Sequence, residues 1–174
     1  MREQTTPDRV PDADADELID AFLSASRALV GLAARSLAGL DTDVTLPQYR
    51  ALVVLASRGP RKIREIAEEL GVNPSTGTRM CDRLVRKGLI RRSRTPSDRR
   101  AVRLTLTPAG RHLIDEVTRR RREELTALVH EATPSRWHRP LAEALRAFAA
   151  QAGEPSDKEW WLGWPSSRGA EDDE

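Results

Sequence analysis

The sequence has few of the residues that build disulfide frameworks, metal sites and membrane spans. It contains a single cysteine, Cys81, and three histidines, His112, His130 and His138, that are scattered without the spacing of a ligand set. A single cysteine excludes an intramolecular disulfide, and scattered histidines argue against a metal site. No apolar run approaches the ~18 to 20 residues that span a bilayer. We therefore expect no metal, no cofactor and no membrane partner.

Patterns that carry catalysis are absent as well. The sequence shows no Ser-His-Asp set, no paired carboxylates at catalytic spacing and no phosphate-binding glycine loop. Residues 1–17 are acidic and lack the basic-then-apolar order of a secretory signal, so we expect a cytoplasmic protein. With 174 residues, 39% of them hydrophobic and 32% charged, the chain suits one helix-rich core with flexible ends. An enzyme is not expected.

What the sequence does contain is a local excess of basic residues. Residues 58–103 hold fourteen lysines and arginines against five acidic residues, a net charge of +9. Because the whole chain carries +2, the remaining residues carry −7. Such asymmetry is typical of a module that binds a polyanion and is flanked by neutral or acidic helices, although a merely solvated basic face would look the same.

The middle of the chain has the pattern of a helix-turn-helix. Apolar spacing predicts a short helix over residues 63–70, in which the small Ala67 would let another helix cross closely. Asn73 is a good N-cap and Pro74 suits the first helical position, so a second helix is expected from there to Lys87. A glycine in the left-handed cap position then ends it.

The second helix has one apolar face and one polar face. Apolar neighbours surround Cys81 on the first, which favours an inert core thiol over a redox sensor, the alternative that stays open. The N-terminal half of this helix would enter the major groove of DNA. The polar side chains expected there are Ser75, Thr76, Thr78, Arg79 and Arg83.

The residues after this helix predict a basic hairpin. Strands are expected over residues 89–94 and 101–107, and the polar stretch 95–100 between them is rich in turn formers. Arginine at the tip suits the narrow minor groove, and Asp98 is placed to orient the guanidinium of Arg100. The side chains expected to face inward from the second strand are Val102, Leu104 and Leu106.

Short motifs run through this whole region. The hairpin contains Asp98-x-Arg100 followed by Leu106-Thr107 and Pro108-Ala109-Gly110. The helix-turn-helix contains Ile66-Ala67, Gly71-Val72, Ser75-Thr76, Thr78-Arg79, Leu84-Val85 and Lys87-Gly88-Leu89-Ile90. Together they resemble the MarR (multiple antibiotic resistance regulator) family of winged helix-turn-helix transcription regulators. The resemblance is specific over residues 46–110 and architectural over residues 16–152.

The resemblance implies roles for individual residues. Ser75, Thr76, Thr78 and Arg79 would contact DNA from the recognition helix. In the wing, Arg100 supported by Asp98 would enter the minor groove, with Arg99 as the next candidate and Arg94 as a backbone contact. One departure from the family pattern is Lys62, which occupies a helix-cap position usually filled by a hydroxyl residue; losing such a cap costs about 1 kcal/mol.

The flanking segments predict amphipathic helices whose apolar stripes the compact winged module cannot cover. Pairing with a second copy is the economical solution, and the resemblance implies the same interlaced helices. A two-fold dimer would read an inverted repeat with half-sites ~10 bp apart. The expected organisation is a flexible arm (1–15), a dimerisation helix (16–45), the winged helix-turn-helix domain (46–107), C-terminal dimerisation helices (108–152) and a Trp-rich then acidic tail (153–174).

The expected fold class is therefore mainly α with a small β wing, a winged helix-turn-helix domain with N- and C-terminal dimerisation helices. The expected function is a ligand-responsive repressor that binds double-stranded DNA as a homodimer, released by a small aromatic or anionic effector. One alternative is a winged-helix dimer used as a protein-interaction scaffold through Trp160, Trp161 and Trp164. The other is a regulator that senses redox state through Cys81.

Overall fold

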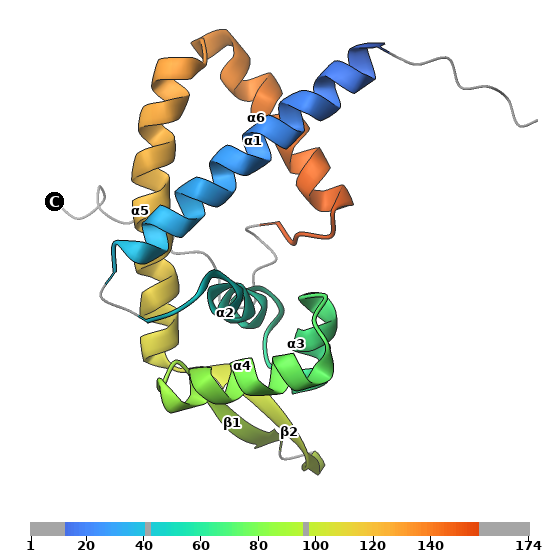
Figure 1. Ribbon diagram of the computed structural model, residues 1–174, viewed down its shortest axis with the longest axis vertical. Helices are drawn as coiled ribbons and strands as arrows, with labels where there is room; N and C mark the ends of the chain where they lie inside the picture. Colours follow the sequence, from blue (N-terminus) through green and yellow to red (C-terminus); the bar gives the residue numbers. More distant parts are fainter. Residues whose placement is uncertain (1–12, 41–42, 96–97, 157–174) are drawn as a thin grey trace, which may run out of the picture.

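The computed structural model describes residues 13–40, 43–95 and 98–156, and for residues 94, 95 and 98–101 it describes the backbone only. Most of the chain is helical, with one two-stranded antiparallel sheet, so the expected fold class is confirmed (Figure 1). The expected arm at 1–15 falls largely outside the described residues, as do the three tail tryptophans. In chain order the elements are α1 (Ala13–Ala38), α2 (Leu46–Arg58), α3 (Ile63–Glu69), α4 (Pro74–Arg86), β1 (Ile90–Thr95), β2 (Asp98–Leu106), α5 (Pro108–Ala132) and α6 (Ser135–Gln151).

The helix-turn-helix forms where the caps predict it. The side chain of Asn73 accepts a hydrogen bond from the backbone of Thr76 at 2.9 Å, which starts α4. At the other end, Gly88 has a φ of 69°, a left-handed conformation that glycine adopts without strain. The backbone of Leu89 donates to the Leu84 carbonyl at 3.1 Å, closing a Schellman cap. Both predicted ends of the recognition helix are thus confirmed.

A close helix crossing sets the position of α4 on α3. A Cβ built on Gly77 would lie 2.7 Å from the Cβ of Ala67, closer than real Cβ atoms approach. The predicted close crossing at Ala67 is therefore confirmed, and its partner is a glycine. Below this crossing the core is continuous between α2, α4, the sheet and α5. Its most deeply buried large side chains include Leu52, Leu55, Ile66, Leu84, Leu104 and Val117.

The hairpin is tighter than the sequence predicts. The strand β2 begins at Asp98, so residues 98–100 belong to a strand and the expected turn over 95–100 is wrong. Asp98 can pair with Thr95 despite its polar side chain, because a strand ladder needs backbone groups only. Arg94 pairs with Val102 but Thr95 pairs with Asp98, so the ladder is irregular there. Val102, expected to face inward, is 41% exposed, whereas Leu104 is fully buried.

A third segment joins the hairpin. Arg61 and Leu104 exchange two backbone hydrogen bonds, of 3.2 and 2.7 Å, which anchors the start of α3 to β2. At that start, Lys62 makes no side-chain cap, as its residue type predicts. Instead its backbone N–H donates to the carboxylate of Glu65 at 2.9 Å. This hydrogen bond is the half of a capping box in which the third residue of the helix accepts from the backbone of the cap residue.

The helices α1, α5 and α6 form an open frame above the winged module (Figure 1). The helix α1 starts at Ala13, three residues before the predicted start, and crosses α5. The helix α6 buries none of its residues in the described part of the chain. It is held by a stack of Phe148 on Phe22 at 4.6 Å and by a hydrogen bond from Arg58 to the Gly153 carbonyl at 2.8 Å. None of the helices within the described residues is long and apolar enough to cross a bilayer.

Candidate nucleic-acid interface

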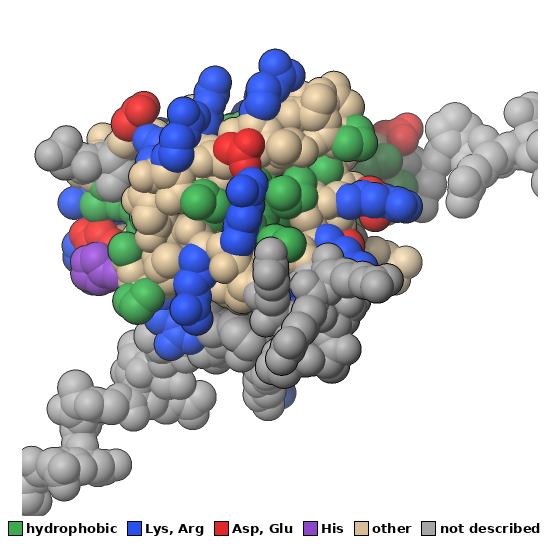
Figure 2. All heavy atoms as spheres, turned by 90° about the horizontal axis from the view of Figure 1, so that it is seen from below, with side chains coloured by type: hydrophobic (Ala, Val, Ile, Leu, Met, Phe, Trp, Pro, Cys, Tyr) green, Lys and Arg blue, Asp and Glu red, His purple; other side chains and the backbone are tan. Residues whose placement is uncertain are grey.

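The helix α4 lies at one end of the molecule, beside the hairpin (Figure 1). Seen from that end, basic side chains are spread over the surface (Figure 2). Of the residues predicted to contact DNA from this helix, Ser75, Thr78, Arg79 and Arg83 are exposed and Thr76 is half-buried. The structure therefore brings the predicted contact set together on one accessible face, with Thr76 the least available member.

The two exposed hydroxyls of this face are held by neighbouring acceptors. The hydroxyl of Ser75 donates to Oδ1 of Asn73 at 2.8 Å. The hydroxyl of Thr78 donates to the Pro74 carbonyl, one helical turn earlier, at 2.9 Å. Both side chains are therefore oriented before any ligand arrives, which lowers the entropy cost of binding.

The two arginines of this face are free to bind an anion. Among the side chains that the structure describes, no carboxylate forms an ion pair with Arg79 or Arg83. They line a hollow together with other residues of α4 and β1, namely Asp82, Val85, Arg86 and Arg92. Unpaired guanidinium groups beside a helix suit phosphate groups and the O6 and N7 acceptors of guanine.

Two ion pairs that sequence analysis did not identify support this face. Asp82 of α4 pairs with Arg92 of β1 at 2.6 Å, so it links the recognition helix to the hairpin. Lys87, after the end of α4, pairs with Asp43 ahead of α2 at 3.1 Å. Asp82 is one of only five acidic residues among fourteen basic ones in residues 58–103. This scarcity of acidic residues was the one sequence signal that Asp82 has a structural role.

The predicted wing residues lie in the hairpin, but their side chains are outside the described part of the structure. The backbones of Arg94, Asp98, Arg99 and Arg100 belong to β1 and β2. No contact of these side chains is described, so the orienting role of Asp98 toward Arg100 stays a prediction.

The thiol of Cys81 faces the core. Its side chain is fully buried at the back of α4, among the residues that pack against α2. Burial, with a smaller contribution from the carboxylate of Asp82, raises the pKa of the Cys81 thiol to about 11. Since the thiolate is the reactive form, this environment favours the core thiol over the redox sensor.

We expect the native protein to react with iodoacetamide at pH 8 at least about tenfold more slowly than the unfolded chain, because little thiolate forms and access is blocked.

The raised pKa of Cys81 also makes the stability of the protein depend on pH. The folded state favours the neutral thiol, so stability is full below pH 9 and falls as the pH rises toward 11. Urea unfolding of the parent and of Cys81→Ala between pH 8 and pH 10 measures it. If the free energy of unfolding changed equally with pH in both proteins, the raised pKa of Cys81 would be contradicted.

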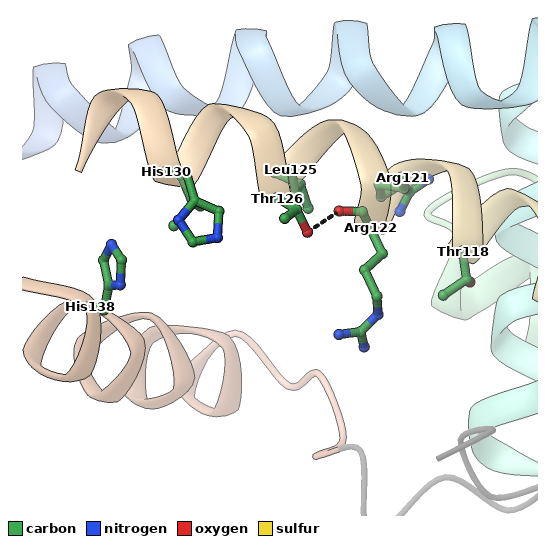
Figure 3. A pocket seen from close by; sticks show the side chains of 8 residues that line it. Thr118, Arg121, Arg122, Leu125, Thr126, His130 and His138 are labelled. Atoms are coloured by element: carbon green, nitrogen blue, oxygen red, sulfur yellow. Dashed lines mark hydrogen bonds between the residues drawn. The ribbon is translucent and has the colours of Figure 1, made fainter. Parts of the chain in front are cut away.

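A second site lies between α5 and α6 (Figure 3), two helices that meet at the end of the molecule opposite the hairpin (Figure 1). It is a cavity of about 470 Å³. Its lining consists of Thr118, Arg121, Arg122, Leu125, Thr126, Val129 and His130 of α5 and His138 of α6. The rings of His130 and His138 lie 6.2 Å apart between centroids, edge to face. The histidines are therefore not all scattered: the turn between the two helices brings this pair together.

This cavity is connected to the helix-turn-helix through Arg121. The guanidinium of Arg121 lies over the ring of Tyr49, 5.7 Å from its centroid, and Tyr49 belongs to α2. The Nε of Arg121 is buried and has no hydrogen-bond partner among the residues that the structure describes. Burial raises the pKa of Tyr49, and Arg121 and a hydrogen bond with Thr118 oppose the rise. Sequence analysis missed the site, although its α5 residues recur every three or four positions.

Comparisons with known proteins agree with this geometry. A model of the MarR family matches residues 44–102. The HTH-type transcriptional repressor MdtR of Bacillus subtilis is 35% identical over 116 residues, covering 67% of this chain and 74% of MdtR. Four curated Bacillus subtilis regulators are each matched over 42% to 74% of their own length.

Solved structures give the same result over most of the chain. The crystal structure of Rv1404 from Mycobacterium tuberculosis is 42% identical, with a TM-score of 0.74, and the match covers 82% of this chain and 96% of that one. The structure of Streptococcus pneumoniae FabT in complex with DNA has a TM-score of 0.63 at 20% identity, over 80% of this chain and 97% of FabT. The likeness to FabT therefore concerns the fold.

Proposed function

Because the chain belongs to the MarR family and is a DNA-binding transcription regulator, we propose that it is a ligand-responsive repressor acting as a homodimer on an inverted-repeat operator. The observation that carries the proposal is the exposed face of α4, where Arg79 and Arg83 have no ion-pair partner among the described side chains. A recognition helix needs such free donors at its surface. The similarity to a repressor, MdtR, supports the direction of regulation.

Exposed apolar faces support the homodimer. Five large apolar residues of α1 are each at least half exposed: Leu18, Ile19, Leu23, Leu29 and Val30. The helix α6 adds Trp137, Leu141, Leu145 and Phe148, each more than 40% exposed. A soluble monomer rarely shows so much contiguous apolar surface, and a second copy of the same chain offers a matching face. We therefore assign residues 16–45 and 108–152 to dimerisation.

The wing completes the proposed interface. Arg100, with Asp98 two residues before it, would enter the minor groove, whose negative potential attracts arginine. Arg99 is the next candidate for the same groove, and Arg94 would contact the sugar-phosphate backbone. Asp98 would fix the guanidinium of Arg100 by a charge-assisted hydrogen bond.

The cavity between α5 and α6 is our candidate effector site. Arg121 and Arg122 offer positive charge, and Leu125 and Val129 offer apolar contact, so the lining suits a small aromatic or anionic molecule. The unpaired Nε of Arg121 could donate to a carboxylate. A ligand that moved Arg121 would also move Tyr49 and α2, and would thereby bias the spacing of the recognition helices.

Fluorescence anisotropy titrations test the proposal. The purified full-length chain is titrated against DNA from its own upstream region and against a scrambled duplex, at two salt concentrations. We expect salt-sensitive binding that favours the native DNA by ~10³ or more. Weak and equal binding to the two duplexes would contradict operator recognition.

Arg100→Ala, at the wing, is expected to weaken operator binding without unfolding the protein, because residues 98–100 are polar and the buried side chain that β2 gives to the core is Leu104. Arg146→Ala in α6 removes the same charge far from α4 and serves as the control. Binding by Arg100→Ala as tight as that of the parent at both salt concentrations would exclude the minor-groove role.

A further inference from the structure

The hydroxyl of Ser75 has its proton committed to the protein. Its partner is Oδ1 of Asn73, at 2.8 Å. The same Oδ1 accepts the backbone N–H of Thr76 at 2.9 Å, and an N–H group can only donate. The atom that faces Ser75 must therefore be the amide oxygen and not the amide nitrogen. Since that oxygen can only accept, the serine hydroxyl is the donor.

The hydroxyl of Thr78 is committed in the same way. It lies 2.9 Å from the Pro74 carbonyl oxygen, which is an acceptor without a proton. The threonine must donate this hydrogen bond as well. The two residues are three positions apart on the exposed side of α4, so their oxygens project toward the same surface.

A hydroxyl that donates its only proton inward presents only lone pairs outward. In the major groove, the hydrogen-bond donors are the N4 amine of cytosine and the N6 amine of adenine, whereas guanine and thymine present acceptors. We propose that Ser75 and Thr78 act as acceptor-only readers that select cytosine or adenine at two positions of each half-site. This inference rests on the proposed operator recognition and adds the chemistry of the bases read.

Arg79 supplies the opposite polarity on the same face. It carries only donors, and no described side chain forms an ion pair with it. Guanine, with two acceptors in the major groove, is its matching base. The operator half-site should therefore combine an acceptor-rich position under Arg79 with amine-bearing positions under Ser75 and Thr78.

The caps explain why the hydroxyls would keep this polarity on DNA. Turning the Ser75 hydroxyl to donate to a guanine or thymine would give up its hydrogen bond to Asn73. One such hydrogen bond changes an equilibrium by about threefold to tenfold. That factor is the expected preference at each position.

The experiment uses the full-length protein and a randomised duplex library. The parent selects its preferred sequence, and selections with Ser75→Ala and Thr78→Val identify the base that each hydroxyl reads, as the position whose preference is lost. Because every base pair carries one such amine, the read-out is amine removal: at each position that a variant relaxes, the adenine or cytosine is replaced by an analogue without its exocyclic amine. The parent is expected to lose affinity by about threefold to tenfold at both positions. Unchanged affinity of the parent for both amine-free duplexes, or no position relaxed by either variant, would overturn the inference.

Asn73→Gly is the decisive variant. Glycine is also an acceptable N-cap, so the helix should persist, but the Ser75 hydroxyl loses its acceptor and becomes able to donate. We expect the preference at the Ser75 position to relax while the Thr78 position, whose partner is a main-chain carbonyl, keeps its own. An unchanged preference at the Ser75 position would contradict the inference alone. A parent that selects no sequence from the library would overturn the proposed operator function and this inference together.

Discussion

Leu145→Glu in α6 is expected to convert the protein from a dimer into a monomer and to lower its affinity for a two-half-site operator by a factor of about 10² or more. Leu145 is 45% exposed in the isolated chain, in the apolar stripe that includes Trp137 and Phe148. In the proposed dimer this stripe meets the partner, where an unpaired carboxylate would be desolvated. A monomer holds one recognition helix, so it loses the gain in effective concentration that comes from binding both half-sites.

Ala150→Glu is the matched control for this prediction. It adds the same charge to the same helix, but its position on the helical wheel is opposite the stripe, and the residue is exposed. Light scattering after gel filtration measures the mass, and anisotropy measures the affinity on one-site and two-site duplexes. The dimer interface is placed wrongly if Leu145→Glu keeps twice the mass of the 174-residue chain.

The parts of the fold that the sequence predicts are those decided by neighbouring residues. Asn73 and Gly88 bound α4 because a cap needs only a side-chain oxygen at one end and a left-handed backbone at the other. The first turn of α5 follows the same rule, with Thr107 accepting from the backbone of Gly110 at 3.1 Å. These signals are local, so they survive without knowledge of the tertiary structure.

The parts that the sequence does not predict depend on partners far along the chain. The bridge between Arg61 and Leu104 joins residues that no periodicity connects. Asp82 meets Arg92 only because the hairpin folds back beside α4. The early start of β2 was missed because polarity at residues 98–100 indicates a turn, whereas the backbone of Asp98 pairs with Thr95 whatever its side chain.

The candidate effector site was hidden from sequence analysis for a related reason. Its α5 residues follow a helical period, but they mix arginine, threonine and leucine, so no apolar stripe stands out. His138 reaches the site only after the chain turns at Thr133 and enters α6. By contrast, the α4 face could be predicted, because all its residues lie within three turns of one helix.

Gly77→Val is expected to destabilise the helix-turn-helix and to lower operator affinity. The Cβ of any residue at this position would lie 2.7 Å from the Cβ of Ala67 and 3.4 Å from its Cα. Both atoms are fixed by the backbone of α3, so no rotamer change relieves the contact. Overpacking of this kind costs about 1 to 3 kcal/mol. Valine gains little in helix propensity over glycine, so the loss is not offset.

Gly77→Ala separates the two contributions. Alanine gains about 1 kcal/mol of helix propensity, so its net loss should be smaller than that of valine. Combining it with Ala67→Gly moves the methyl group from α3 to α4 and restores one methyl at the crossing. Urea unfolding should therefore show the double variant to be more stable than the sum of the two single changes. If the changes in unfolding free energy were additive, α3 and α4 would not meet at this pair. Another contact would then set the position of α4 on α3.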